Sequence, residues 1–591
     1  MFLQQRLPYL VIGMVALCAI AQAEWRNALV SLAEPSDPVT LVSRAKPAGH
    51  IQLPPRPTPQ ERKAAADLQH WIAQITSATL PIKKSARGAV VSIRTDDACN
   101  DEEYRIQVDG RRILLYGGRT RGVVNAVYAL LEEDMGCRFY TNESIRLPTT
   151  STLVARPVPR RYGPRLKLRD PFYYCAFDPV WSLRNRTNAP DAKVPEAHGG
   201  HVDYDNMFVH TMDKLVSATV YFKKHPEYFA LQPDGSRNPI ALCATEPKVA
   251  KIAIKAVRDI LRRNPNTEII SVSKNDTTVV CHCERCKKLR DAEGSDIANQ
   301  LVLVNKIADA IAADYPRVTI DTLAYLETIQ VPKTVRPRKN VAIRLCNDAV
   351  GAWTYPFRPA EQCDIAKLAS AWAAVHHRIY IWDYNVNFSH YLAPMPNLDI
   401  MAANIRFWIR NNAEGVMLQG GYQGAAEQDH MKCWVTAKLM WDASWDEKEL
   451  VHDFIWGHYA SAAPAMQEYD DLLQQMRVEH KPTMDKPAQG IRYPMDAPFI
   501  TRDFITSASA LFSRARELAG GDTALLQRIE RAELPILYVQ CERGAEFTGP
   551  EYAAVVDRFA LVARREKVNT TREGPTDLDA KIAGYHAKVR K

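Results

Sequence analysis

Several features that would identify a common class of function are missing from this sequence. It contains no P-loop, no G-x-S-x-G turn, no H-E-x-x-H helix, and no strand followed by a G-x-G-x-x-G helix start. It has no block of Lys and Arg that would follow a phosphate backbone, and its net charge of +8 is modest for 591 residues. Beyond the N-terminal region, no stretch approaches the ~20 apolar residues of a membrane helix. We therefore expect neither a nucleic-acid partner nor a membrane span.

The composition is that of a folded protein with several domains. Hydrophobic residues make up 46% of the chain, charged residues make up 24%, and 37 prolines are spread along it. At ~150 residues for a domain, the chain suffices for about three or four domains, or for one large barrel with added modules. A single small binding module and a mainly disordered chain are both excluded.

Residues 1–23 are typical of a secretory signal peptide. Arg6 supplies the positive charge, Leu10–Ile20 form a short apolar run, and Ala21–Ala23 match the small-x-small cleavage pattern. A lipid anchor on Cys18 is disfavoured because a leucine, rather than a small residue, precedes it. We expect cleavage near Ala23 and a secreted or periplasmic mature protein.

The spacing of apolar residues predicts three folded parts after the signal peptide. Residues 24–157 alternate strands and helices, which predicts a small α/β sandwich domain. Residues 165–440 repeat strand-then-helix units, which are typical of parallel strands and favour a (β/α)8-type barrel. A doubly wound sheet is the alternative, because fewer than eight strands are clear. Residues 441–591 are predicted to be an α-helical region.

Six strands are predicted in the central part from runs rich in apolar and β-branched residues: 166–174, 268–273, 318–325, 341–346, 378–382 and 415–419. In a barrel of this kind, reactive groups follow the carboxyl ends of the strands, because those loops meet at one mouth. Carboxylates flanked by Trp and Tyr occur at several of these ends. This combination suits glycosidic cleavage, in which one acid protonates the leaving oxygen and another carboxylate attacks or activates water.

The candidate catalytic residues are Asp383, Asp276 and Asp348. Asp383 ranks first because it directly follows a buried strand and has an aromatic residue on each side. Asp276 is its expected partner and Asp348 the reserve. Asp276 also has a plain alternative role in a turn, because Asn-Asp is common turn chemistry. Glu327 ranks below these three.

The candidate substrate-binding residues lie at the same strand ends and provide rings, amides and a guanidinium. For the histidines the alternative is a core or rim position, and for the arginine it is a structural ion pair. The candidates are His210, Asn275, Tyr325, Arg344, Trp382, Tyr384, His390 and Tyr422.

Cys281, Cys283 and Cys286 stand out among the 12 cysteines as three thiols within six residues. His282 or the distant Cys243 would complete a tetrahedral metal site. The spacing lacks the paired C-x-x-C runs of an established zinc class, and outside the cytosol a disulfide competes directly. We expect a structural role, with a disulfide favoured over a metal, and we expect no cofactor.

Several ordered sequence blocks stand out in the central part. They are His225-Pro226-Glu227-Tyr228-Phe229, Leu242-Cys243-Ala244-Thr245, residues 270–276 with 281–286, Asp321-Thr322-Leu323-Ala324-Tyr325, Ile381-Trp382-Asp383-Tyr384 and Asn387-Phe388-Ser389-His390-Tyr391. With these blocks, about residues 165–440 resemble the bacterial domain family DUF4838. The N-terminal segments 61–81 and 117–140 are similar to the accessory α/β domain that precedes the barrel in family 20 hexosaminidases and family 67 α-glucuronidases.

The resemblance implies a secreted, polysaccharide-acting protein with a glycosidase-like barrel. We expect a glycoside hydrolase that acts on a glycan, with an acidic one (uronic acid or amino sugar) as the candidate substrate. The paired Asp-Glu of family 20 is not found after any predicted strand, and Leu418-Gln419 stand where relatives often carry a Glu. The alternative is therefore a non-catalytic glycan-binding protein on the same barrel.

Overall fold

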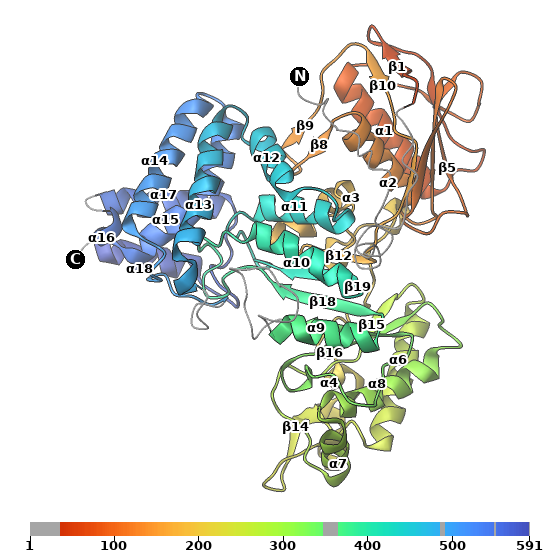
Figure 1. Ribbon diagram of the computed structural model, residues 1–591, viewed down its shortest axis with the longest axis vertical. Coiled ribbons are helices and arrows are strands. Elements are labelled where there is room, and N and C mark those ends of the chain that lie inside the picture. Colours follow the sequence, from red (N-terminus) through yellow and green to blue (C-terminus); the bar gives the residue numbers. More distant parts are fainter. Residues whose placement is uncertain (1–35, 347–363, 485–490, 549–550, 590–591) are drawn as a thin grey trace, which may run out of the picture.

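The computed structural model describes residues 36–346, 364–484, 491–548 and 551–589 (Figure 1). The expected signal peptide, residues 1–23, lies outside the described residues. Figure 1 shows an N-terminal α/β part at the upper right, a central parallel sheet with its helices, and a group of C-terminal helices at the left. The predicted α/β class and the order of its three parts are confirmed.

A six-stranded sheet and two helices build most of the N-terminal part. The strand order is β11-β6-β7-β5-β3-β4, and three further strands form a small sheet in the order β10-β1-β2. The elements are β1 (Val39–Ser43), β2 (Lys46–Pro47), β3 (His50–Gln52), α1 (Pro59–Thr76), β4 (Ile82–Lys83), β5 (Ala89–Thr95), β6 (Tyr104–Asp109), β7 (Arg112–Gly117), α2 (Gly122–Ala129), the hairpin β8 (Arg138–Phe139) and β9 (Ile145–Arg146), β10 (Leu153–Ala155) and β11 (Arg160–Tyr162).

Local sequence signals set the start of α1 and the end of the segment that contains α2. Thr58 Oγ1 accepts a hydrogen bond from the Glu61 N–H at 3.1 Å, and Glu61 Oε2 accepts one from the Thr58 N–H at 2.7 Å. Helix α2 continues as one π-helical turn, Leu130–Asp134. Gly136 follows with φ +78°, the left-handed conformation expected of a glycine that ends a helix.

The central sheet has six parallel strands in the described residues, in the order β12-β19-β18-β17-β16-β15. The first strand therefore pairs with the last, as in a barrel and unlike a doubly wound sheet. All six predicted strands are confirmed: β17 has the predicted bounds, and each of the others is shifted at one end or both. They are β12 (Leu168–Asp170), β15 (Ile269–Ser271), β16 (Thr319–Ala324), β17 (Val341–Cys346), β18 (Ile379–Tyr384) and β19 (Ala413–Gln419).

An irregular segment fills the gap between β12 and β15. The Ile269 N–H donates to the Asp203 carbonyl at 3.1 Å, and the Ser271 N–H donates to the Met207 carbonyl at 2.9 Å. On the other side, the Val202 N–H donates to the Asn188 carbonyl, and the Asn188 N–H donates to that of Arg169 in β12. Non-strand backbone thus occupies a place where a regular barrel has a strand.

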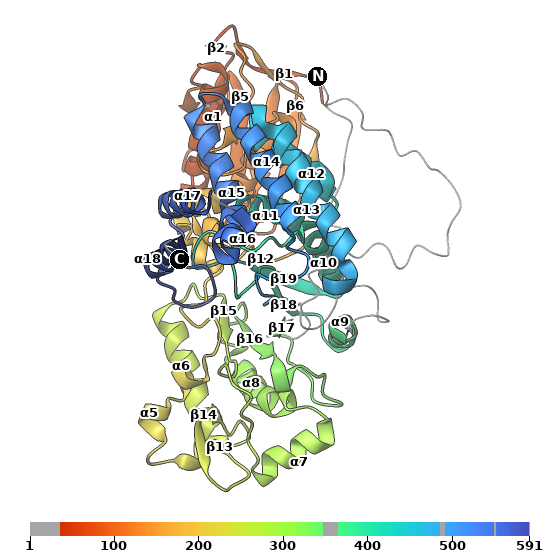
Figure 2. The same cartoon turned by 90° about the vertical axis from the view of Figure 1, so that its left-hand side faces the viewer.

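Helices cover the outer face of this sheet, and a small lobe extends from it. The lobe, with the hairpin β13-β14 and helix α7, lies at the bottom of Figures 1 and 2, far from the N-terminal part. The elements are α3 (Pro179–Arg184), α4 (Met212–Leu215), α5 (Ala218–Tyr221), β13 (Phe229–Leu231), β14 (Arg237–Leu242), α6 (Pro247–Arg263), α7 (Glu284–Glu293), α8 (Ile297–Ile311), α9 (Asp364–Val375), α10 (Leu398–Arg410) and α11 (Asp429–Trp441).

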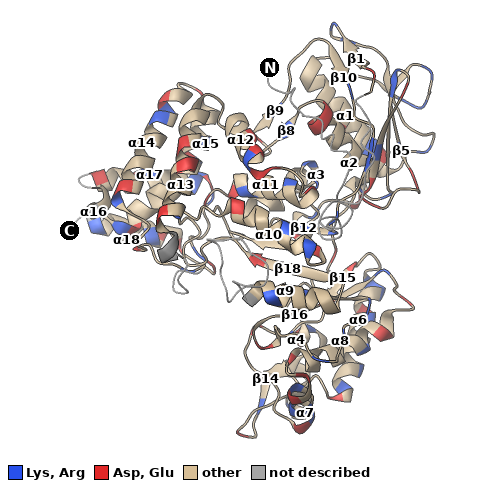
Figure 3. Cartoon of the chain, viewed as in Figure 1, with Lys and Arg blue, Asp and Glu red and all other residues tan. Residues whose placement is uncertain are grey.

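The C-terminal part is helical, as predicted. Acidic and basic residues are mixed along its helices (Figure 3). In the described part of the chain, no helix is long and apolar enough to cross a membrane. The helices are α12 (Glu447–His458), α13 (Ala463–Met484), α14 (Arg502–Ala519), α15 (Thr523–Arg543), α16 (Ala545–Thr548), α17 (Tyr552–Arg565) and α18 (Leu578–Val589).

Buried charges join the N-terminal part to the barrel. Glu132, at the end of the second helix, forms ion pairs with Arg186 and with Lys438 of α11, and all three side chains are at most 4% exposed. Arg186 also contacts Glu133 at 3.0 Å. Burial lowers the pKa of Lys438 to about 8, whereas the Glu132 carboxylate opposes this shift.

We predict that Glu132→Gln destabilises the protein strongly. The substitution keeps the shape but leaves Lys438 without its carboxylate in a buried site, and breaking such a pair costs about 3–5 kcal/mol. The thermal midpoint should fall clearly. Arg119→Gln is the matched control: it breaks an ion pair with Asp97 in which both side chains are more than 70% exposed, and exposed pairs are worth about 0–1 kcal/mol. Equal midpoints for the two variants would contradict the prediction.

Candidate functional site

The two faces of each barrel strand lead to different surroundings, and β18 shows this most clearly. Tyr380 packs with Leu168 and Ile269 in a cluster inside the barrel. Trp382 and Tyr384 lie on the same face, with ring centroids 6.0 Å apart. Ile381 and Asp383 point the other way, toward the helices. The carboxyl end of β18 therefore presents aromatic rings, rather than a carboxylate, to the barrel mouth.

Asp383 is the main correction to the predicted site. Its Oδ2 accepts a hydrogen bond from Trp408 Nε1 of α10 at 3.4 Å, and its Oδ1 accepts one from the Tyr384 N–H at 3.0 Å. The side chain is 2% exposed. The expected position in the mouth beside Trp382, Tyr384 and His390 is wrong, because alternation along the strand turns Asp383 toward the outer helix layer.

Arg344 is also placed differently from the prediction, which had it contact substrate. It is completely buried inside the barrel and forms an ion pair with Asp321 of β16 at 2.7 Å. Its guanidinium also donates to the hydroxyl of Tyr204 and lies 5.0 Å from the ring centre of Phe208. The geometry supports the alternative of a structural ion pair. Nearby Asp170 is buried too, and its burial raises its pKa well above the usual range.

Aromatic side chains line the mouth above this ion pair. The ring of Phe208, from the irregular segment, lies 5.8 Å from that of Trp382. Trp382 Nε1 donates to Gln419 Oε1 at 2.6 Å, which links the ends of β18 and β19. The row continues through Tyr384 to Phe388, 5.4 Å away. Phe208, Trp382 and Tyr384 are all partly exposed.

A second aromatic contact lies at the end of β19. Tyr422 packs against Phe172, which follows β12, with ring centroids 5.2 Å apart. Both side chains are partly exposed. The predicted residues Trp382, Tyr384 and Tyr422 therefore all belong to the strand ends of β18 and β19.

A polar group occupies the ends of β15 and β16. Lys274 Nζ contacts Glu327 Oε2 at 3.0 Å, and the Lys274 carbonyl is 2.9 Å from Nδ1 of His210. The Lys274 side chain is 9% exposed, whereas that of Glu327 is 32% exposed. The carboxylate of Glu327 is thus partly exposed to solvent, while the Lys274 ammonium holds one of its oxygens. Tyr325, which directly precedes this turn, is partly exposed.

The remaining predicted residues are dispersed. Asp276 is exposed in the loop after β15, and the Asn275 side chain donates to the Ile240 carbonyl of the β14 hairpin at 2.7 Å. Asp348 lies outside the described residues. The expected pairing of Asp383 with Asp276 is therefore not supported by the positions of their side chains.

His390 lines a basic pocket at the junction of the barrel and the C-terminal part. The pocket has a volume of about 370 Å³ and is lined by Phe388, Ser389, His390, Arg492, Arg572, Glu573, Thr576 and Lys581. His390 Nδ1 lies 2.8 Å from the Tyr538 hydroxyl of α15, and burial lowers the His390 pKa. Phe388 joins this pocket to the aromatic row of the mouth.

The charges of this pocket are not balanced within it. Arg492 contacts Glu573 at 3.2 Å, and Lys581 contacts Glu542 at 2.7 Å. Arg572 is exposed, and it forms no ion pair with any other described residue. One guanidinium is therefore available to an anionic ligand.

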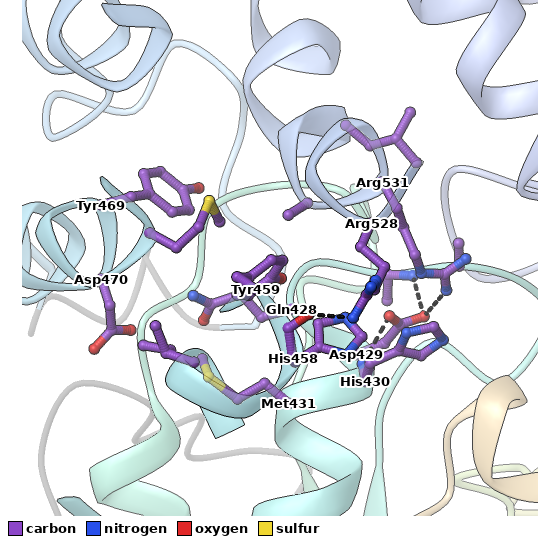
Figure 4. Close-up of a pocket in the computed structure, with 16 residues that line it drawn as sticks. Gln428, Asp429, His430, Met431, His458, Tyr459, Tyr469, Asp470, Arg528 and Arg531 are labelled. Atoms are coloured by element: carbon purple, nitrogen blue, oxygen red, sulfur yellow. Dashed lines mark hydrogen bonds and ion pairs between the residues drawn. The ribbon is translucent and has the colours of Figure 1, made fainter. Parts of the chain in front are cut away.

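A second cavity is enclosed between α11 and the C-terminal helices (Figure 4). Its volume is about 40 Å³, which is enough for water but not for a sugar ring. Asp429 and Arg531 form an ion pair at 2.7 Å on its wall. Burial lowers the pKa of His430 to about 4, so this histidine is neutral at pH 7. We assign these groups to the packing of the C-terminal part on the barrel.

A family model described as "Domain of unknown function (DUF4838)" matches residues 139–471. The chain belongs to the DUF4838 family. The match extends beyond the predicted range at both ends, into the N-terminal part and into helix α13. No curated protein matches this DUF4838 chain.

Solved structures with a similar fold include glycoside hydrolases. One is BtGH115A, a family GH115 4-O-methyl-alpha-glucuronidase with specificity for decorated arabinogalactans: identity is 10%, the TM-score is 0.57, and the match covers 91% of this chain and 81% of that chain. A mutant Streptomyces plicatus beta-hexosaminidase with bound GlcNAc has 12% identity and a TM-score of 0.42, over 74% and 94% of the two chains. At these identities, the match to BtGH115A supports a shared fold only. The TM-score of the match to the hexosaminidase is too low to support an argument.

Sequence reasoning missed the residues that the fold brings to the site from a distance. Phe208 lies in a segment without a strand pattern, and Arg492, Arg572 and Lys581 come from the helical part, for which no binding role was expected. Lys274 was in a predicted strand end but was not selected. A guanidinium without an ion-pair partner is a property of the folded chain, and the sequence carries no signal for it.

We predict that Asp383→Asn lowers stability. An amide has one acceptor oxygen, so its NH2 group would face either the Trp408 or the Tyr384 N–H, and a buried donor without an acceptor costs about 1–3 kcal/mol. Asp276→Asn, in an exposed loop, should change stability by less than about 0.5 kcal/mol. Thermal midpoints measure both effects. A large loss of turnover in Asp383→Asn with an unchanged midpoint would instead favour the original catalytic assignment.

Proposed function

We propose that this protein is a secreted glycoside hydrolase that acts on an acidic glycan at the carboxyl ends of β15 to β19. One observation carries the proposal: partly exposed aromatic rings lead from the barrel mouth to a pocket that contains Arg572, an arginine with no ion-pair partner among the residues that the structure describes. The fold, which resembles that of a glycoside hydrolase, agrees with this proposal but does not by itself establish an activity.

The aromatic row suits a chain of sugars. Sugar rings stack on aromatic faces, and Phe208, Trp382 and Tyr384 offer three successive partly exposed rings. The hydrogen bond to Gln419 fixes the indole of Trp382, so little side-chain entropy is lost when a ligand binds. The row is therefore proposed as the platform for the glycan.

The basic pocket suits an acidic substituent. A guanidinium binds a carboxylate or sulfate with two parallel hydrogen bonds, and Arg572 is available for this contact. Arg492 lies over Phe388 at 5.3 Å, so it belongs both to the pocket and to the end of the aromatic row. A uronic acid residue at this end of the bound chain is the proposed ligand.

Glu327 is proposed as one catalytic carboxylate. The neighbouring Lys274 ammonium holds one carboxylate oxygen, and the partial exposure of Glu327 leaves the side chain within reach of a substrate in the mouth. Asp276 and Asp348 remain the proposed partners, because both follow barrel strands. Asp383 is proposed as a positioning residue for the loop that carries Tyr384.

A glycan-binding protein without catalytic activity is the second candidate. It is favoured by two features of the described strand ends: the side chain at the end of β19 is the amide Gln419, and the carboxylate of β18 faces the outer helices. Two measurements on the same acidic oligosaccharides separate the two candidates: the release of new reducing ends, and binding by calorimetry. A hydrolase should release reducing ends, whereas a glycan-binding protein should bind without releasing them.

We predict that Glu327→Gln reduces turnover by about 10²–10⁴-fold, the range for loss of a general acid or base. The amide oxygen can still accept a hydrogen bond from Lys274, so KM should change little. The thermal midpoint should fall less than in Glu132→Gln, because Glu327 is partly exposed and water can reach its end of the pair. Asp276→Asn, measured in parallel, tests the proposed partner. Full activity of Glu327→Gln would remove this residue from the mechanism.

We predict that Arg572→Gln weakens binding of uronic-acid oligosaccharides by about tenfold or more, because a charge-assisted hydrogen bond contributes about 1.5–3 kcal/mol. Binding of the same oligosaccharides after carboxyl reduction should not change. Arg317→Gln is the matched control, because this exposed arginine lies at the opposite, amino end of β16. An equal loss for acidic and reduced ligands would show that Arg572 does not recognise the acid.

A further inference from the structure

Four cysteines come together in the lobe that lies farthest from the N-terminal part. Cys243 directly follows strand β14, and Cys281 lies beside β13, where the next residue's N–H donates to the Leu231 carbonyl at 2.8 Å. Cys283 is the residue just before helix α7, and Cys286 lies in the first turn of that helix. The four sulfur atoms all lie within 4.8 Å of one another.

The separations between these sulfurs match one kind of site. Cys243 Sγ is 3.6 Å from Cys283 Sγ and 3.8 Å from Cys286 Sγ. A disulfide requires about 2.05 Å. In a tetrahedral site with Zn–S bonds of about 2.3 Å, neighbouring sulfurs lie about 3.8 Å apart. No disulfide links these four cysteines.

The surroundings of the sulfurs favour thiolates. The Leu231 N–H donates to Cys281 Sγ at 3.4 Å, and the Thr245 hydroxyl lies 3.1 Å from Cys286 Sγ. The N-terminus of α7 also directs its positive end toward Cys283 and Cys286. Hydrogen bonds of this kind are usual in the outer shell of a metal site.

The four cysteines form a small apolar cluster apart from the main core. That cluster contains four buried residues, and three of them are Cys243, Cys281 and Cys286, whereas Phe229 and Leu242 of the hairpin pack in the main core. So few apolar side chains contribute little to holding the start of α7 on the hairpin, and small units of this kind depend on disulfides or metals. A metal bound by all four sulfurs would join β13, β14 and α7 at one point.

We propose that Cys243, Cys281, Cys283 and Cys286 form a structural metal site of the zinc class. All four ligands come from the protein, so the metal has no open position for substrate and does not take part in turnover. This proposal reverses the preference for a disulfide that the sequence suggested. It is independent of the proposed glycan site.

Metal analysis of the full-length protein, purified without reducing agent or chelator, tests the proposal. We expect plasma mass spectrometry to find about one zinc per chain. If the four thiolates hold iron instead, the protein should contain iron and show an absorption band in the visible range. A strong chelator should lower the thermal midpoint, and added Zn²⁺ should restore it. Cys283→Ser should lose most of the metal, whereas the control Cys99→Ser, in the N-terminal part, should retain it.

Two outcomes would overturn the proposal. In the first, mass spectrometry of unreduced peptides finds these four cysteines in two disulfides. In the second, alkylation of the native protein finds four free thiols and added Zn²⁺ neither binds nor raises the thermal midpoint. If Cys283→Ser does not fold, the metal content and thiol state of the unaltered protein decide between these results.

Discussion

The ion pair between Arg344 and Asp321 inside the barrel determines how the mouth is built. Arg344 is fully buried, so its charge must be met within the barrel, and Asp321, the Tyr204 hydroxyl and the faces of Phe208 and Tyr380 meet it. Two of these residues belong to the irregular segment between β12 and β15. The ion pair thus fixes this segment, and the segment places Phe208 against Trp382 at the first step of the aromatic row.

The sequence predicted where the barrel strands are but not which way their side chains point. Apolar runs identified all six strands, because parallel strands are buried on both faces. For the same reason apolar and polar residues, whose alternation would reveal the face of each side chain, do not alternate along β18 (Ile-Tyr-Ile-Trp-Asp-Tyr), which is buried at its first three positions. Asp383 was consequently placed one face away from its actual position. A carboxylate one position earlier or later along β18 would point into the barrel mouth, whereas Asp383 points outward and accepts a hydrogen bond from Trp408.

The sequence also did not predict sites whose residues are far apart in the chain and come together only in the fold. Cys243 joins the cysteine run only when β14 pairs with β13, and His282, its nearer rival as fourth ligand, does not join the group of four. The basic pocket is assembled from the loop after β18 and from two later segments more than 100 residues away. Local sequence patterns predict caps, turns and strands, because these depend on residues a few positions apart. They do not predict contacts between residues that are far apart in the chain.

The interfaces suggest different tasks for the two flanking parts. The N-terminal part supplies Glu102, Glu132 and Glu133, which neutralise Arg169, Arg186 and Lys438 of the barrel region. These arginines also lie within 5.3 Å of the Trp441 ring, on the side away from the mouth. The C-terminal part instead supplies Arg572 and Lys581 to a pocket that adjoins the mouth. Removing the N-terminal part would therefore leave buried cations unpaired and lower stability, whereas removing the C-terminal part would take Arg572 and Lys581 from the proposed site. The accessory and site-forming roles that we propose thus follow from which end of the barrel each part covers.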